Sequence, residues 1–82
     1  MTLTTRTTEK VALGNALRRN TPLNPEEFHF PPHPDICRAI LAVRASGQRV
    51  GLLTVGAWLK AEGLLEEVGG TLYLAELMLA AQ

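Results

Sequence analysis

Four stretches of this chain repeat apolar residues at the spacing of one helix face, and turn or proline signals separate them. The first stretch predicts a helix over residues 9–19, because Leu13, Ala16 and Leu17 fall at i, i+3 and i+4. Thr8 is the expected N-cap of this helix, since its hydroxyl can accept a hydrogen bond from a free amide of the first turn.

The residues before that helix are rich in threonine and poor in large apolar side chains. We therefore expect a flexible N-terminal arm over residues 1–8 and one helical domain over residues 9–82. A chain of this length buries only about 60% of its unfolded surface and does not support two cores. Within the first helix, Gly14 lowers stability by about 1 kcal/mol relative to alanine, which favours a close contact with another helix there.

The second stretch predicts a helix over residues 35–45. Pro34 and Asp35 favour its start, and Gly47 is placed as its left-handed stop. Its apolar stripe is formed by Ile36, Ala39, Ile40 and Val43.

We predict a third helix over residues 55–62, capped by Thr54, and a fourth helix that begins at Thr71. The stretch GLLEEVGGTLY, residues 63–73, joins them. It starts with a glycine stop, continues with two leucines that can fold back on the third helix, and includes a glycine pair that permits a sharp turn. We expect a helix-to-helix connector here rather than a catalytic loop.

All five prolines lie in the segment NTPLNPEEFHFPPHP, residues 20–34, so no regular helix is expected there. Phe28 and Phe30 are spaced as on one side of an extended segment, which predicts that both rings cover the core as a lid. Since no stretch alternates strongly enough for a strand, the predicted fold class is all-α, a small orthogonal bundle of four to five short helices. The predicted core consists of Leu13, Leu17, Phe28, Ile36, Ile40, Val43, Val55, Leu59, Leu65, Val68, Tyr73, Leu74 and Leu77.

Composition narrows the possible classes of protein. Hydrophobic residues make up 46% and charged residues 20% of the chain, which indicates a globular fold. Eight basic residues balance eight acidic ones, so no overall field attracts nucleic acid or a membrane surface. The single cysteine and the lack of a signal-peptide pattern favour the cytoplasm. Because the core is small, self-association would add useful stability.

His29, His33 and Cys37 repeat at four-residue spacing, and imidazole and thiolate are zinc ligands. A fourth ligand is lacking and prolines interrupt the spacing, so we expect a polar loop beside a buried cysteine, with a metal site or an activated thiol as alternatives. The adjacent Glu66 and Glu67 diverge and do not form an acid-base pair. There is no GxxxxGK[ST] loop, so we expect no cofactor and no enzymatic activity from this chain alone.

The run HPDICRAILAVRASGQRVGLLTVGAWLKAEGLLEEVGGTLYLAEL, residues 33–77, resembles the N-terminal domain of bacterial replicative DNA helicases of the DnaB family. In that family a helix opening with His is followed by a T[VL]...L helix, a G.L..VGG connector and a YLAEL helix. Upstream, EKVALGNAL at 9–17 and PEEF at 25–28 are similar to the family's E..VLG.LL helix and P.DF stretch. The matching positions are His33, Ala39, Ile40, Val43, Gly47, Thr54, Val55, Leu59, Gly63, Leu65, Val68, Gly69, Gly70 and residues 73–77.

The resemblance implies a small protein-binding module of DNA replication. In the family this domain forms the collar of the hexameric ring and takes part in contacts with primase and loading factors. The chain stops shortly after YLAEL, before the family's helical hairpin and ATPase motor, so it is not expected to be an active helicase alone. Gly51 stands where an acidic residue is common. A helicase fragment and a stand-alone phage or plasmid protein both fit this pattern.

The expected partners are therefore a replicative helicase, a primase or a helicase loader, without direct nucleic-acid or membrane binding. The alternative is a helix-turn-helix DNA-binding regulator that reads DNA with its third or fourth helix. Only Lys60 is basic on those helices, so phosphate contacts would be scarce. The residues predicted to contact a protein partner are Arg18, Arg19, Trp58, Leu64, Glu66 and Glu67.

Overall fold

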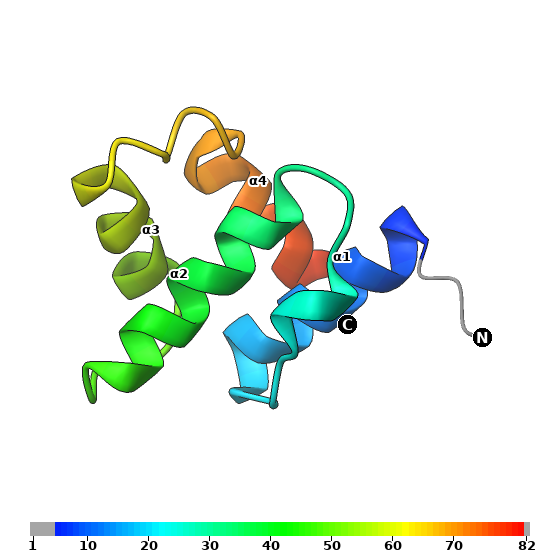
Figure 1. The fold of residues 1–82 in the computed structure, drawn as a ribbon, viewed down its shortest axis with the longest axis horizontal. Helices are drawn as coiled ribbons and strands as arrows, with labels where there is room; N and C mark the ends of the chain where they lie inside the picture. Colours follow the sequence, from blue (N-terminus) through cyan, green and yellow to red (C-terminus); the bar gives the residue numbers. More distant parts are fainter. Residues whose placement is uncertain (1–4, 82) are drawn as a thin grey trace.

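The computed structural model describes residues 5–81, and its regular structure within that range is helical (Figure 1). In chain order the elements are α1 (Arg6–Arg19), the short 3-10 helix η1 (Pro25–Glu27), α2 (His33–Ala45), α3 (Leu52–Ala61) and α4 (Gly70–Ala80). The helix α1 packs mainly against α4, and α2 packs mainly against α3. The predicted all-α fold class is confirmed.

The α-helices begin earlier than the sequence pattern predicted. The N-cap of α1 is Thr5 and not Thr8, because the Thr5 hydroxyl oxygen accepts the Thr8 amide at 3.1 Å. Residues 6–8 are therefore helical, and the prediction of an arm is wrong for them. Residues 1–4 of the predicted arm lie outside the described range.

The prediction that Thr54 is the N-cap of α3 is also wrong. Thr54 is the third residue of the helix and not its N-cap. Its Oγ1 accepts a hydrogen bond from the Gly51 amide at 3.0 Å and donates to the Arg49 carbonyl oxygen at 2.6 Å. The threonine thus stabilises the helix start from inside the first turn, as in the second half of a capping box.

The predicted helix ends are confirmed at two glycines. Gly47 and Gly63 have φ angles of 82° and 72°, in the left-handed region that ends a helix. After α3, the Leu64 amide donates to the Leu59 carbonyl at 2.8 Å and the Gly63 amide donates to the Lys60 carbonyl at 3.1 Å. This Schellman pattern folds Leu64 back so that it packs against the core.

The core lies between the helices and largely follows the predicted stripes. Leu65 and Tyr73 are only partly buried, and the lid prediction is wrong for Phe30, which is exposed while Phe28 is buried. The amides of residues 29 and 30 both point at one carboxylate, so the chain turns there and the two rings diverge. The buried apolar residues are Leu13, Ala16, Leu17, Phe28, Ile36, Cys37, Ala39, Ile40, Val43, Val55, Leu59, Val68, Leu74, Leu77 and Ala81.

The helices α1 and α4 approach each other closely at Gly14, which confirms the expected role of this glycine. A Cβ atom at Gly14 would overlap the carbonyl oxygen of Leu77 and would lie 2.8 Å from the Ala81 Cβ. The two backbones can approach this closely only because residue 14 has no side chain.

Candidate functional site

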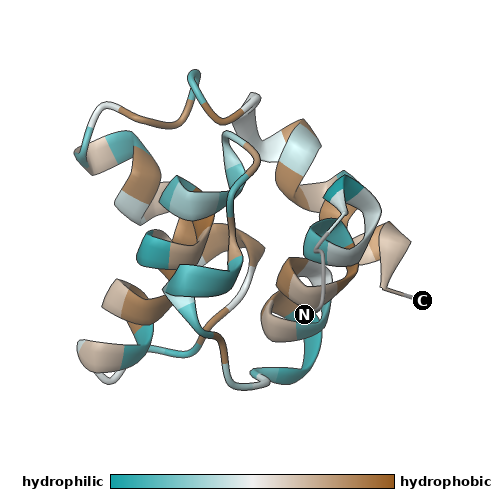
Figure 2. Cartoon of the chain, turned by 45° about the vertical axis from the view of Figure 1, so that its right-hand side comes forward, coloured by the Kyte–Doolittle hydropathy of each residue, from teal (hydrophilic) through white to brown (hydrophobic). Residues whose placement is uncertain are grey.

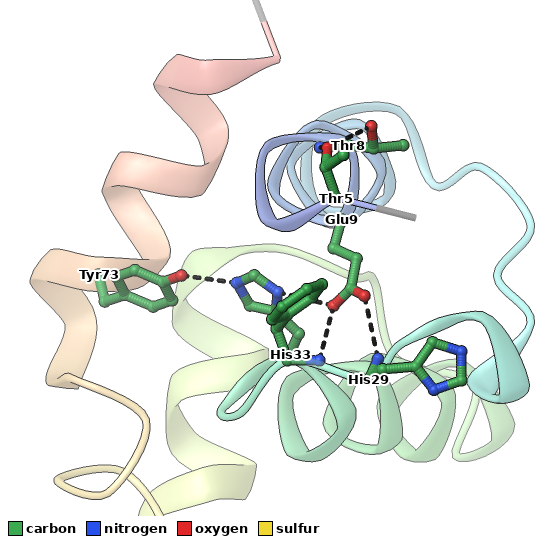
Figure 3. Close-up of polar contacts among 7 residues, drawn as sticks. Thr5, Thr8, Glu9, His29, His33 and Tyr73 are labelled. Carbon is green, nitrogen blue, oxygen red and sulfur yellow. Dashed lines mark hydrogen bonds and ion pairs between the residues drawn. The ribbon is translucent and has the colours of Figure 1, made fainter. Parts of the chain in front are cut away.

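Three polar side chains from three helices meet inside the bundle (Figure 3). Glu9 of α1 and His33 of α2 are almost completely buried, and Tyr73 of α4 is partly buried. The Oε1 atom of Glu9 lies 2.9 Å from Nδ1 of His33, and Nε2 of His33 lies 2.6 Å from the Tyr73 hydroxyl. We call Glu9, His33 and Tyr73 the polar junction.

Main-chain groups complete the polar junction. The His29 amide donates to Glu9 Oε2 at 3.0 Å, and the Phe30 amide donates to Glu9 Oε1 at 3.2 Å. A carboxylate can only accept hydrogen bonds, so Nδ1 of His33 is the donor to Glu9. In the neutral ring Nε2 then accepts from the Tyr73 hydroxyl. The junction therefore ties α1, the proline-rich segment, α2 and α4 together.

Sequence reasoning missed this junction, although a signal was present. Leu13 and Ala16 follow Glu9 by four and seven residues, which places Glu9 on the buried face of α1. Ile36 and Ile40 follow His33 by three and seven residues, which places His33 on the buried face of α2. The residue type alone marks both positions as polar, and only their helical phase shows that they lie on buried faces. A buried acid on an apolar face needs donors nearby, and that requirement was the available clue.

The alternative metal and thiolate interpretations are not supported by the positions of the three candidates. His29 is exposed, and both ring nitrogens of His33 already have hydrogen-bond partners. Within residues 5–81, no group of three or more His, Cys, Asp or Glu side chains is arranged to hold a metal ion. Burial raises the pKa of the Cys37 thiol to about 11, partly opposed by Arg44, so the thiol stays protonated at neutral pH.

The predicted contact residues fall into two groups, near opposite ends of α4. Arg18 and Arg19 are exposed at the end of α1, and Nη1 of Arg18 donates to the Met78 carbonyl near the end of α4 at 3.3 Å. Of the other four residues, Trp58 lies on α3, and Leu64, Glu66 and Glu67 lie in the connector that leads into α4.

The second group forms what we call the connector surface, made of residues 58, 60 and 63–67. Its hollow has a volume of about 360 Å³ and is lined by Lys60, Gly63, Leu65 and Glu66. Trp58 and Leu64 are partly buried, whereas Glu66 and Glu67 are exposed. The surface therefore combines apolar area with charges of both signs.

Exposed leucines are a feature that the sequence analysis did not identify. Leu53 on α3 and Leu72 and Leu79 on α4 expose 85%, 73% and 63% of their surface. Leu72 lies on the side of α4 that faces away from the core. Figure 2 shows that hydrophobic residues continue to the C-terminal end of α4. Within the described range, the helices are too short or too polar to cross a bilayer.

Comparisons with known proteins agree with the resemblance found in the sequence. The family model "DnaB-like helicase N terminal domain" matches residues 8–82. The chain is 47% identical over 55 residues to the replicative DNA helicase DnaB of Geobacillus stearothermophilus, a match that covers 67% of this chain and 12% of that protein. The chain is also 44% identical over 55 residues to the replicative DNA helicase DnaB of Rhodothermus marinus. This match covers 67% of this chain and 6% of that protein.

The matched region is thus a small part of each of these helicases. No solved structure matches the chain significantly. The family model nevertheless covers nearly the whole sequence, including α1 with Glu9, α2 with His33 and α4 with Tyr73. This chain belongs to the DnaB-like helicase N-terminal domain family.

Proposed function

We propose that this chain is a protein-binding module of DNA replication that contacts a replicative helicase, a primase or a helicase loader in the cytoplasm. The observation that carries the proposal is the match of residues 8–82 to the N-terminal domain of DnaB-like helicases. The two relatives described above are named as replicative DNA helicases. The module works through its contacts and does not itself hydrolyse ATP.

The distribution of chemical groups supports binding rather than catalysis. Glu9 and His33, the groups best suited to acid-base chemistry, are buried and hydrogen-bonded to each other. Cys37 is a buried neutral thiol. The surface instead offers apolar area and charges of both signs, which is the composition of a protein-protein interface.

The connector surface is the better candidate for the replication partner. Tryptophan is enriched among the residues that dominate binding energy, and Trp58 is partly buried on α3, the helix that leads into the connector. The connector is held by the Schellman ending of α3 and by the buried side chain of Val68, so little ordering is needed on binding. The exposed carboxylates Glu66 and Glu67 favour a partner with basic residues around an apolar anchor.

Binding of the purified chain to purified helicase, primase and loader from its own host tests this proposal. We expect one of them to bind, and we expect the double variant Glu66→Lys/Glu67→Lys to weaken that binding about tenfold. The matched control Glu26→Lys/Glu27→Lys reverses an equally exposed acid pair on η1 and should leave the Kd unchanged. If all three proteins bind more weakly than about 100 μM by interferometry, the proposal fails.

The helix-turn-helix alternative has less support. The helix α3 carries one basic residue, Lys60, and α4 carries none. Phosphate contacts supply most of the affinity of a DNA-binding domain, so this surface would bind duplex DNA weakly. A gel shift with duplex DNA that weakens as salt is added would favour the regulator instead.

A further inference from the structure

The positive and negative charges of this chain lie in separate stretches. Residues 36–61 contain no acidic residue, whereas residues 62–82 contain four glutamates and no basic residue. The first stretch covers most of α2 and the whole of α3, and its basic residues are Arg38, Arg44, Arg49 and Lys60. The chain is neutral as a whole, but this asymmetry gives it a cationic region that attracts acidic groups.

Two of these four cations are engaged inside the chain. Arg38 forms an ion pair at 3.3 Å with the aspartate three residues before it. Arg44 donates to two oxygen atoms of the segment that follows α1, at 3.0 Å and 2.8 Å. Within residues 5–81, no ion pair involves Arg49 or Lys60, and both of these residues are exposed. Their charges are therefore available to a partner.

The outer side of α3 places an exposed leucine beside these two cations. Leu53 leaves 85% of its surface exposed, more than any other large apolar residue in the described range. Ala57 and Lys60, both exposed, follow Leu53 by four and seven residues, so all three lie on one side of the helix. Lys60 lies about 10 Å further along the helix axis than Leu53.

Arg49 reaches the same side of α3 from the loop before the helix. Its main-chain carbonyl oxygen accepts a hydrogen bond from the Thr54 hydroxyl at 2.6 Å, which holds residue 49 beside the first turn. Arg49, Val50 and Leu53 are among the residues that line a hollow of about 290 Å³. We call the following residues the α3 face: Arg49, Val50, Leu53, Ala57 and Lys60. This face has an apolar middle with a cation at each end.

We propose that the α3 face binds an acidic helical segment of a partner protein. An apolar side chain of the segment packs on Leu53, and carboxylates on either side of it contact Arg49 and Lys60. Along a partner helix, two carboxylates seven residues apart are separated by about 10 Å, which matches the length of the α3 face. A residue three or four positions after the first carboxylate lies between them on the same side, so the apolar residue belongs there.

The chemistry of the α3 face favours a protein segment over a nucleic acid. Nucleic acids carry a phosphate at every nucleotide, and proteins bind single strands with a cationic groove and aromatic rings on which the bases stack. The α3 face instead has two free cations and an aliphatic middle. Trp58, the aromatic residue of α3, lies about 140° from Leu53 around the helix axis, so its ring is not part of this face.

The α3 face and the connector surface select partners of opposite charge. The connector surface carries the exposed carboxylates of Glu66 and Glu67, which favour basic groups. Lys60 lies where the two surfaces meet. A chain with both surfaces can bind a basic partner and an acidic partner, so this inference goes beyond the single replication contact proposed above.

Titration of the 15N-labelled chain with a synthetic peptide, followed through its amide NMR shifts, tests the proposal. The probe is an alanine-based peptide of about 18 residues with two glutamates seven positions apart and one leucine between them. We expect shift changes at residues 49–60 and not at residues 64–67, with a Kd on the order of a few hundred micromolar. A control peptide with lysines in place of the glutamates should bind at least about tenfold more weakly.

Two variants and two matched controls locate the binding site. Arg49→Glu and Leu53→Ala should each weaken binding of the glutamate peptide about fivefold. Arg6→Glu makes the same charge change at an exposed residue that begins α1, at the opposite end of the molecule from α3 (Figure 1). Leu72→Ala makes the same truncation at a leucine of α4 that is 73% exposed. Both controls should leave the Kd unchanged.

Several results would overturn the proposal. One is the lack of any shift change with up to about 2 mM glutamate peptide, and another is equal binding of the lysine peptide. A single-stranded oligonucleotide that binds the same residues more tightly would assign the α3 face to nucleic acid instead. Shifts at these residues that change when the chain alone is diluted would assign it to a second copy. None of the varied residues belongs to the connector surface, so this test and that of the replication partner can fail separately.

Discussion

The helices α1 and α4 meet at two places that are built in opposite ways. Near the start of α1, Glu9 reaches α4 through His33 and the Tyr73 hydroxyl, so the contact depends on directional hydrogen bonds through a third helix. Further along α1, the backbone at Gly14 lies directly against Leu77 of α4. The first contact depends on groups that are present, and the second depends on a side chain that is absent.

This difference predicts two kinds of sensitivity. Losing one partner of the polar junction leaves buried donors or acceptors unsatisfied, and each unsatisfied group destabilises the folded state. At the Gly14 crossing the harmful change is an added atom, because close-packed backbones leave no space for it. A small domain has little stability to spare, so changes at both places should be easy to measure.

Removing the Glu9 carboxylate should have the largest effect. Glu9→Ala leaves the amides of His29 and Phe30 and Nδ1 of His33 without their acceptor. We expect the free energy of unfolding to fall by about 3–5 kcal/mol. Urea unfolding followed by the fluorescence of the single tryptophan, Trp58, measures this loss.

The matched control for this variant is Glu67→Ala, because Glu67 is exposed. It should change the unfolding free energy by less than about 0.5 kcal/mol. Similar urea midpoints for the two variants would show that the buried carboxylate contributes nothing special to the fold.

Adding one methyl group at the crossing should have the next largest effect. Gly14→Ala places a Cβ on the carbonyl oxygen of Leu77, so α1 and α4 must move apart. We expect a loss of about 2–3 kcal/mol, even though alanine favours helix by about 1 kcal/mol over glycine. Thermal unfolding followed by circular dichroism measures the change.

Gly56→Ala on α3 is the control for the crossing. A Cβ there would lie 3.5 Å from Thr71 Cγ2, an ordinary contact, so this variant should be neutral or up to about 1 kcal/mol more stable. If both alanine variants had the same effect, close approach at Gly14 would not be the reason for its glycine.

Removing the Tyr73 hydroxyl should have a smaller effect than removing Glu9. Tyr73→Phe keeps the aromatic ring but leaves Nε2 of His33 without its partner at 2.6 Å. We expect a loss of about 1–2 kcal/mol, measured by urea unfolding. In the Glu9→Ala background the same change should have less effect, because the two residues act through one imidazole. Full additivity in this double-mutant cycle would argue against a connected junction.

The smallest loss of folding stability is expected at alkaline pH, where the buried thiol of Cys37 on α2 ionises. Burial raises the pKa of Cys37 from 9.0 to about 11. The thiol therefore ionises in the unfolded chain first, so its contribution to stability is complete below pH 9 and is lost as the pH rises through 11. We expect about 1 kcal/mol to be lost at pH 10.

Comparison with Cys37→Ala isolates this thiol from other groups that titrate at high pH. The difference in unfolding free energy between wild type and variant should shrink by about 1 kcal/mol between pH 8 and pH 10. A difference that stays constant over this range would mean that the thiol has a similar pKa in the folded and unfolded states.

Helical periodicity predicted which faces are buried, because burial follows directly from the phase of the apolar residues. Ile36, Ile40 and Val43 on α2 and Leu74 and Leu77 on α4 are buried as expected. Periodicity does not say which buried faces meet each other. The contact of Glu9 with His33 and of His33 with Tyr73 joins distant positions, and only the assembled fold brings them together.

The surface could be predicted less well than the core. The six predicted contact residues are exposed or partly buried, but their division between the connector and the end of α1 depends on how α1 and α4 cross. They remain predictions as contact residues. Leu72 and Leu79 were not among them, because a leucine in an apolar helix is normally counted as core. Their phase relative to Leu74 and Leu77 places them on the outer side.

The crossing at Gly14 also has a consequence for how the chain is made on the ribosome. The helix α1 emerges before α2 and α3, which follow each other and can pair while synthesis continues, and α4 emerges after them. The face of α1 that surrounds Gly14 therefore stays uncovered until α4 has left the exit tunnel. During that interval the nascent chain presents an apolar helix to chaperones and proteases.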